Sequence, residues 1–100
     1  MLRTYAAIFE DDSEKQRCKV SIPNLSYESE IDYTTNEELL KQAEDELSFA
    51  LWLYEEREGK LPKANTISDK ELPAGAVLRF LSSDYDKYKQ SLSVKEIEIS

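Results

Sequence analysis

The stretch from Thr35 to Gly59 constrains the fold most, because its apolar residues fit one side of a long α-helix. They recur at intervals of three and four and comprise Leu39, Leu40, Ala43, Leu47, Ala50, Leu51 and Tyr54. Thr35 and Glu38 have the spacing of a capping box, in which each side chain accepts a hydrogen bond from the other residue's backbone amide. Gly59 and Pro62 end the pattern, so the sequence predicts a helix of about 22 residues.

Three segments before this helix have the patterns of β-strands. Residues 3–9 are apolar on both alternating faces, as in a strand that has neighbours on both sides. Residues 17–22 and 27–33 alternate between apolar and polar side chains, as in strands with one buried face. The polar residues 10–16 predict a hairpin loop between the first two strands.

Further elements follow the helix. Residues 60–73 form a polar connection that contains two of the three prolines. Residues 75–81 predict a fourth strand, and Ser83 with Asp84 predicts the start of a short helix. Residues 94–99 alternate between apolar and charged side chains, which predicts a final strand.

This order of elements predicts an α+β fold. We expect a β-β-β-α-β sheet with one long helix packed on one face, followed by a short C-terminal helix and strand. The fourth strand is expected to return through a right-handed crossover and to pair parallel to the first. The 100 residues suit a single domain, with a core over residues 3–82 and an extension over residues 83–100.

Negative charge is concentrated in one third of the chain. The net charge is −8, and eleven of the 21 acidic residues but only two of the 13 basic residues lie between Tyr27 and Glu58. Such a field repels phosphate and attracts a basic protein, so we expect no direct binding of nucleic acid. Glu28, Glu30 and Asp32, which alternate along the third strand, are the predicted partner-binding residues. Alternatively, these carboxylates only keep a small protein in solution.

The second half of the long helix is apolar over a wide arc. Phe49, Trp52 and Leu53 extend this arc, so they either belong to the core or form an oligomer interface. Burial of such a face between two copies predicts a homodimer. The apolar runs are far shorter than the ~20 residues that span a bilayer, and a single cysteine suits a reducing compartment. We therefore expect a cytoplasmic protein without a membrane segment.

Candidates for catalysis are few. Glu10, Asp11 and Asp12 come nearest to a metal-dependent nuclease site, but neighbouring residues of a loop point in different directions. A solvated hairpin explains them better. The chain has no histidine, so Cys18 lacks a histidine base and a zinc site is not expected. The sequence predicts a binding protein with no cofactor or metal, and not an enzyme.

Several short motifs, spread over residues 3–90, resemble those of the HicB antitoxin family. The matching segments are residues 5–10 (YAAIFE), 21–25 (SIPNL), 35–39 (TNEEL), 61–63 (LPK), 77–80 (VLRF) and 84–88 (DYDKY). They are similar to the family's Y-x-A-I-F-E, F-P-D-L, T-x-E-E-A and L/I-P-x-P segments, its later strand and its D-x-x-x-Y turn. The order and spacing of these segments carry the resemblance.

The resemblance implies a partial ribonuclease-H-like fold and a defined partner. HicB-type antitoxins neutralise HicA, a small basic toxin that is an mRNA ribonuclease, by covering its active surface. Many members add a C-terminal DNA-binding domain, whereas residues 94–100 resemble only the approach to one, so operator binding is not expected. Two alternatives stay open: a stand-alone structural or adaptor protein of the same fold, for instance phage-borne, and a degenerate metal-dependent nuclease.

Overall fold

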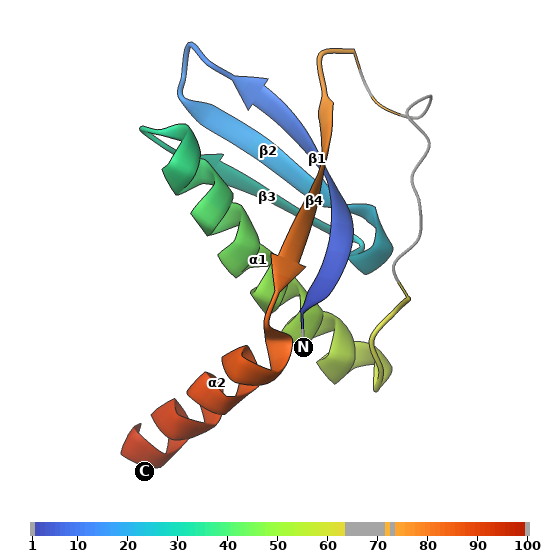
Figure 1. Cartoon of the computed structure of the whole chain (residues 1–100), viewed down its shortest axis with the longest axis vertical. Coiled ribbons are helices and arrows are strands. Elements are labelled where there is room, and N and C mark those ends of the chain that lie inside the picture. The colour runs from blue at the N-terminus through green and yellow to red at the C-terminus, as the bar shows by residue number, and fades with distance from the viewer. Residues whose placement is uncertain (1, 64–71, 73, 100) are drawn as a thin grey trace.

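The computed structural model describes residues 2–63, 72 and 74–99, which form one antiparallel sheet and two helices. The elements are β1 (Arg3–Asp12), β2 (Arg17–Ile22), a 3-10 turn (Pro23–Leu25), β3 (Tyr27–Asp32), α1 (Asn36–Glu58), β4 (Val77–Ser83) and α2 (Tyr85–Ile99). The strands lie in the order β3-β2-β1-β4 (Figure 1). The α+β class, the first three strands and the long helix are as predicted.

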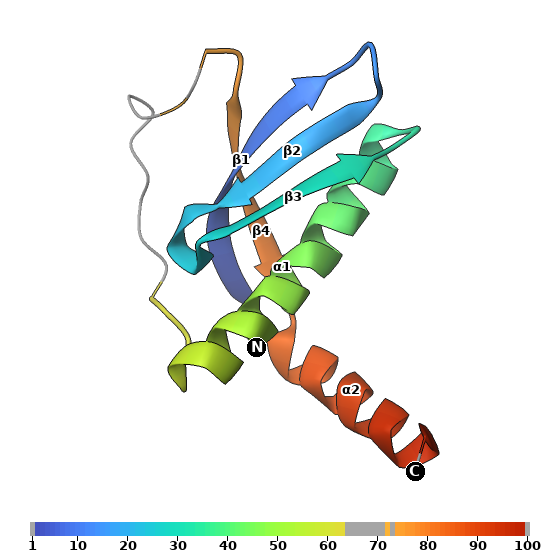
Figure 2. The same cartoon turned by 180° about the vertical axis from the view of Figure 1, so that it is seen from behind.

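The core lies between α1 and the face of the sheet that this helix crosses (Figures 1 and 2). Because strand side chains alternate, every second residue of β2 points at the helix. Cys18, Val20 and Ile22 are at most 1% exposed, as their alternation predicts. They pack with Tyr5, Ala7, Phe9, Leu25, Ile31, Ala43, Leu47, Ala50, Leu51, Leu81 and Tyr85. Burial of each large apolar side chain stabilises the fold by roughly 1.5–3 kcal/mol.

The two ends of α1 follow the sequence signals in most respects. The hydroxyl of Thr35 accepts a hydrogen bond from the amide of Glu38 at 3.1 Å. The Glu38 carboxylate accepts from the hydroxyl of Thr34 at 2.9 Å instead of from the Thr35 amide, so only half of the predicted capping box forms. At the other end, Gly59 has a φ of 77° and its amide donates to the carbonyl of Glu55. Glycine adopts this left-handed conformation at little cost.

β4 runs antiparallel to β1, with Tyr5 opposite Leu81, so the predicted parallel crossover is wrong. The end of α1 lies near the start of β1, and the Tyr5 hydroxyl donates to the carbonyl of Pro62 at 2.7 Å (Figure 1). A parallel fourth strand would begin at that end of the sheet. β4 instead begins at the opposite end, and the connection that carries the chain there includes residues 64–71 and 73, which lie outside the described residues.

The chain after β4 forms one helix, so the predicted final strand at residues 94–99 is wrong. α2 has 15 residues and extends away from the sheet and from α1 (Figure 1). Tyr85 attaches its first turn to the body, since this side chain is 1% exposed and its hydroxyl donates to Glu55 at 3.0 Å. Lys89 pairs with the same carboxylate at 3.2 Å. Neither α1 nor α2, over the residues described, is long and apolar enough to cross a membrane.

Candidate partner-binding surface

The predicted partner-binding carboxylates lie on the face of the sheet opposite α1. In β3, Ile31 points into the core and is 3% exposed. The side chains of Glu28, Glu30 and Asp32 are 65%, 66% and 74% exposed. Their predicted orientation toward solvent is therefore correct, whereas their part in binding stays a prediction.

Basic residues of β2 pair with all three of these acids. Arg17 lies 2.7 Å from the carboxylate of Asp32 and 3.9 Å from that of Glu30. Lys19 lies 3.4 Å from the carboxylate of Glu28. Counting charges along the chain misses these pairs, because they depend on the antiparallel register of β2 and β3. These pairs reduce the negative charge of β3, although Glu10 and Asp12 of β1 lie opposite the same two bases.

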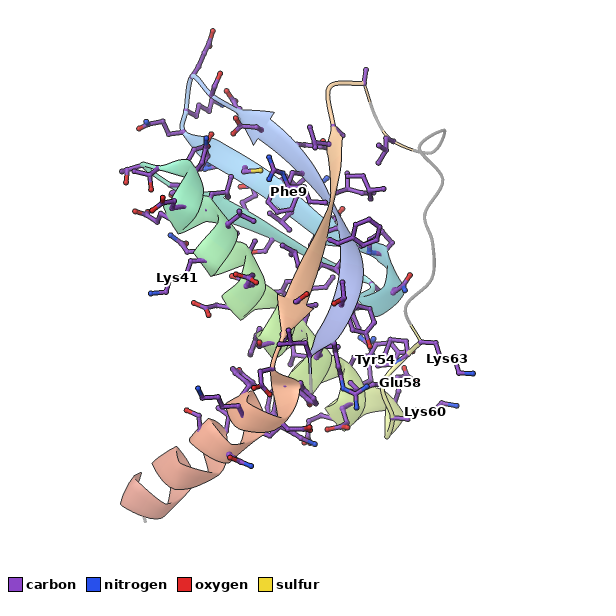
Figure 3. The ribbon with its side chains drawn as sticks, in the orientation of Figure 1. Phe9, Lys41, Tyr54, Glu58, Lys60 and Lys63 are labelled. Carbon is purple, nitrogen blue, oxygen red and sulfur yellow. The ribbon has the colours of Figure 1, made fainter. Side chains whose placement is uncertain are left out.

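The outer surface of α1 carries acids without such partners. Glu37, Glu44, Asp45 and Glu56 are exposed, and no basic side chain within the described residues pairs with them. Lys41 lies on the same helix and points away from the sheet (Figure 3). The unneutralised negative charge is thus greatest on α1, not on β3.

Apolar side chains beside these acids form a surface that we call the aromatic strip, made of Tyr27, Phe49, Trp52 and Leu53. Phe49 is 41% exposed and Leu53 is 38% exposed, whereas Trp52 is half-buried against the core. The rings of Phe49 and Trp52 stack with centroids 6.2 Å apart, and Tyr27 meets Phe49 edge-on at 6.4 Å. Trp52 thus belongs partly to the core. An oligomer interface through Phe49, Trp52 and Leu53 stays a prediction.

A hydrogen bond joins the aromatic strip to the acids of α1. The hydroxyl of Tyr27 donates to the carboxylate of Glu46. Burial, followed by this bond, raises the pKa of Tyr27 to about 12, so the phenol stays protonated at neutral pH. Glu46 is therefore held in place by a neutral hydrogen-bond donor.

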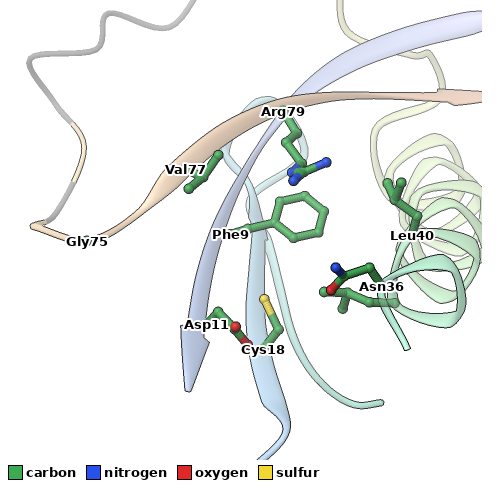
Figure 4. A pocket seen from close by; sticks show the side chains of 9 residues that line it. Phe9, Asp11, Cys18, Asn36, Leu40, Gly75, Val77 and Arg79 are labelled. Carbon is green, nitrogen blue, oxygen red and sulfur yellow. The ribbon is translucent and has the colours of Figure 1, made fainter. Parts of the chain in front are cut away.

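A small pocket at the other end of α1 contains Asp11 and Cys18, two of the four residues considered for catalysis (Figure 4). Its volume is about 190 Å³, below the roughly 300–1,000 Å³ of typical small-molecule sites. The pocket is lined by Phe9, Asp11, Cys18, Asn36, Leu39, Leu40, Gly75, Val77 and Arg79. Burial raises the pKa of the Cys18 thiol, which disfavours the nucleophilic thiolate.

The three candidate carboxylates of a nuclease do not converge. The carboxylate of Asp11 accepts a hydrogen bond from the hydroxyl of Tyr33 on the helix side of the sheet. Glu10 and Asp12 belong to the same strand and alternate to the opposite face. Within the described residues, no three metal-ligating side chains lie together. This arrangement gives the nuclease alternative no support.

Three comparisons with known proteins returned nothing. No family model, curated protein or solved structure matches the chain. The motifs shared with HicB antitoxins thus stay a resemblance, and the case for function depends on the chemistry of the surface.

Proposed function

We propose that this protein is an antitoxin-like binding protein that neutralises a small basic ribonuclease of the HicA type by covering its active surface. One observation carries the proposal. The outer surface of α1 presents Glu37, Glu44, Asp45 and Glu56, which form no ion pair with any described residue, and the same helix exposes the ring of Phe49. A surface that combines free carboxylates with apolar area suits a cationic protein partner.

The charge of such a target explains why its inhibitor should be acidic. A ribonuclease binds a polyanion, so its active surface is positive. An anionic protein surface is attracted to the same region and speeds the encounter, especially at low salt. The aromatic strip lies beside the carboxylates and offers apolar area whose burial stabilises the complex once formed.

The HicB resemblance supports the proposal through the placement of its motifs. Residues 5–10 lie in β1, and residues 35–39 span the capped start of α1. We also propose that the fold is related to the partial ribonuclease-H-like fold, and the related part would comprise β1, β2, β3 and α1. The antiparallel β4 departs from the parallel pairing expected for it. A homodimer and a cytoplasmic setting are likewise proposed.

The test pairs the protein with a small basic protein, sought in the genes that neighbour its own. We expect the purified protein to stop mRNA cleavage by that partner and the association rate to fall with added salt. Cleavage that continues in the presence of excess protein would refute the proposal. A neighbouring gene that encodes no basic protein would favour the adaptor alternative. Mg²⁺-dependent cleavage by this protein alone, lost in Asp11→Asn, would favour the nuclease.

Two triple variants with the same change in net charge locate the binding surface. The α1 variant should slow association by about tenfold at low salt, since steering by charge changes such rates by 10–10³. The β3 variant should have a smaller effect, because its acids lie on the face of the sheet opposite α1, away from the proposed binding surface. Equal effects would contradict the assignment to α1. The variants are E44Q/D45N/E56Q on α1 and E28Q/E30Q/D32N on β3.

A further inference from the structure

An open hollow of about 480 Å³ lies between α1 and the start of β3. It is lined by Tyr27, Gln42, Asp45, Glu46 and Phe49. The hollow joins Asp45 and Glu46 of α1 to the aromatic strip, and α1 and β3 lie side by side in both views of the molecule (Figures 1 and 2). It therefore marks the place where charge and exposed aromatic surface meet.

The polar lining of the hollow offers mainly acceptors, since the hydroxyl of Tyr27 and one N–H of Gln42 already donate to other residues. Tyr27 donates its hydroxyl proton to Glu46. The amide nitrogen of Gln42 donates to Glu38 at 3.3 Å, which leaves its carbonyl oxygen as an acceptor. The carboxylate of Asp45 forms no hydrogen bond or ion pair with any described residue. A ligand that fits this lining must donate several hydrogen bonds and carry positive charge.

The apolar lining favours a planar cation. The ring of Phe49 is 41% exposed and is fixed between Tyr27 and Trp52 at centroid distances of 6.4 and 6.2 Å. A cation over such a ring is attracted to its face. An arginine guanidinium can stack on the ring while its five donors reach the surrounding oxygens, which the compact ammonium of lysine does less well.

Within the chain itself, one arginine already combines an aromatic ring with a carboxylate. The guanidinium of Arg57 lies 5.4 Å from the centroid of the Tyr54 ring and 3.2 Å from the carboxylate of Glu58. Arg57 thus combines an aromatic face with a carboxylate, the pair of groups that Phe49 and Asp45 present to solvent.

We propose that the hollow binds an arginine side chain of a basic protein partner, an inference that rests on the proposed function. The partner's arginine stacks on Phe49 and donates to the oxygens of Asp45, Glu46 and Gln42. A second copy of this chain fits the hollow less well, because the net charge of −8 makes two copies repel each other when their α1 surfaces meet, so the proposed homodimer must use a surface other than the hollow.

The experiment uses the intact protein and a short arginine peptide as the probe, with the same peptide made of citrulline as the uncharged control. Trp52 is the only tryptophan and stacks on Phe49, so its fluorescence reports binding at the hollow. We expect the arginine peptide to change this fluorescence and the citrulline peptide to leave it unchanged. A lysine peptide should bind more weakly than the arginine peptide.

Neighbouring substitutions on α1 provide the matched control. Asp45→Asn should weaken binding about two- to fivefold, as expected for an exposed charge and cation–π site, and Phe49→Leu should weaken it similarly. Glu44→Gln removes the same charge one residue away from the hollow, so it should weaken binding of the short peptide less than Asp45→Asn does. Equal effects of Asp45→Asn and Glu44→Gln, or equal binding of the citrulline peptide, would overturn the proposal.

Three further outcomes distinguish this site from the alternatives. Self-association in sedimentation that Phe49→Leu abolishes would assign the hollow to a second copy and overturn the arginine site. Ribonuclease neutralisation that survives both Asp45→Asn and Phe49→Leu would leave the proposed function standing and place the partner elsewhere. Arginine binding without any neutralisation of a ribonuclease would refute the proposed function and support the arginine site.

Discussion

Tyr85 joins α2 to the body of the protein, and its replacement by phenylalanine tests how much one hydroxyl contributes to that attachment. The ring is 1% exposed, so Tyr85→Phe preserves its packing and removes only the hydrogen bond to Glu55. Hydrogen bonds to charged groups contribute roughly 1.5–3 kcal/mol. The Glu55 side chain is 32% exposed and also binds Lys89, so water and the lysine compensate in part. We therefore expect a loss of about 1 kcal/mol in the free energy of unfolding.

Thermal unfolding followed by circular dichroism measures this loss. About 1 kcal/mol corresponds to a fall in Tm of roughly 4–8 °C for a domain of this size. Tyr88→Phe is the matched control: its ring stacks on that of Tyr85 at 6.3 Å, and its hydroxyl makes no hydrogen bond with any described residue. Equal losses in the two variants, or no loss in Tyr85→Phe at neutral pH, would refute the reasoning.

The pH dependence of the same variant gives an independent check. Burial acts to raise the pKa of Glu55, but the bonds from Tyr85 and Lys89 outweigh it and lower the pKa from the ordinary value of 4.5. A lowered pKa in the folded state stabilises the protein above pH 4.5, and this stability is lost as the pH falls through the folded-state value. The difference between the natural protein and Tyr85→Phe should therefore shrink in acid. A constant difference would contradict the role of the Glu55 charge.

Two further predictions concern α1 and its contact with β3. Thr35→Ala removes the side-chain cap of α1 and should lower the free energy of unfolding by about 1 kcal/mol in a denaturant titration, whereas Thr35→Ser should lower it much less. Tyr27 should be among the last tyrosines to ionise in an absorbance titration, near pH 12, and the protein should lose stability as the pH rises from 10 toward 12, because the folded state holds this proton more tightly. Tyr27→Phe should remove that component of the pH dependence; an unchanged profile would disprove it.

The sequence predicts those elements whose signals are local. The alternation at residues 17–22 and the helical spacing from Thr35 to Gly59 each specify one buried face, and the structure places both faces in the core. Gly59 predicts the end of α1 because few other residues adopt its φ of 77° without strain. The outward orientation of Glu28, Glu30 and Asp32 follows from the same alternation.

Features that depend on contacts between distant parts of the chain are not predicted in this way. The direction of β4 depends on where a long connection places the chain, and residues 60–73 have no periodicity that fixes either end of the sheet. Residues 94–99 alternate like a strand, but six residues are too few to decide between the two periods. A helix that has begun at Tyr85 extends through them at little cost, because each added residue gains a hydrogen bond without a new nucleus.

The ion pairs of β2 and β3 matter most for the candidate site. Glu28, Glu30 and Asp32 carry the same formal charge as Glu44, Asp45 and Glu56, so the two sets are equivalent in a count along the chain. A cationic partner approaching from about 10 Å, the Debye length at 0.1 M salt, responds instead to the sum of neighbouring charges. Arg17 and Lys19 form ion pairs with the acids of β3 and reduce their field, whereas the acids Glu44, Asp45 and Glu56 of α1 have no ion pair with any described residue. The α1 surface therefore guides the encounter, and the apolar side chains of the adjoining aromatic strip stabilise the contact that follows.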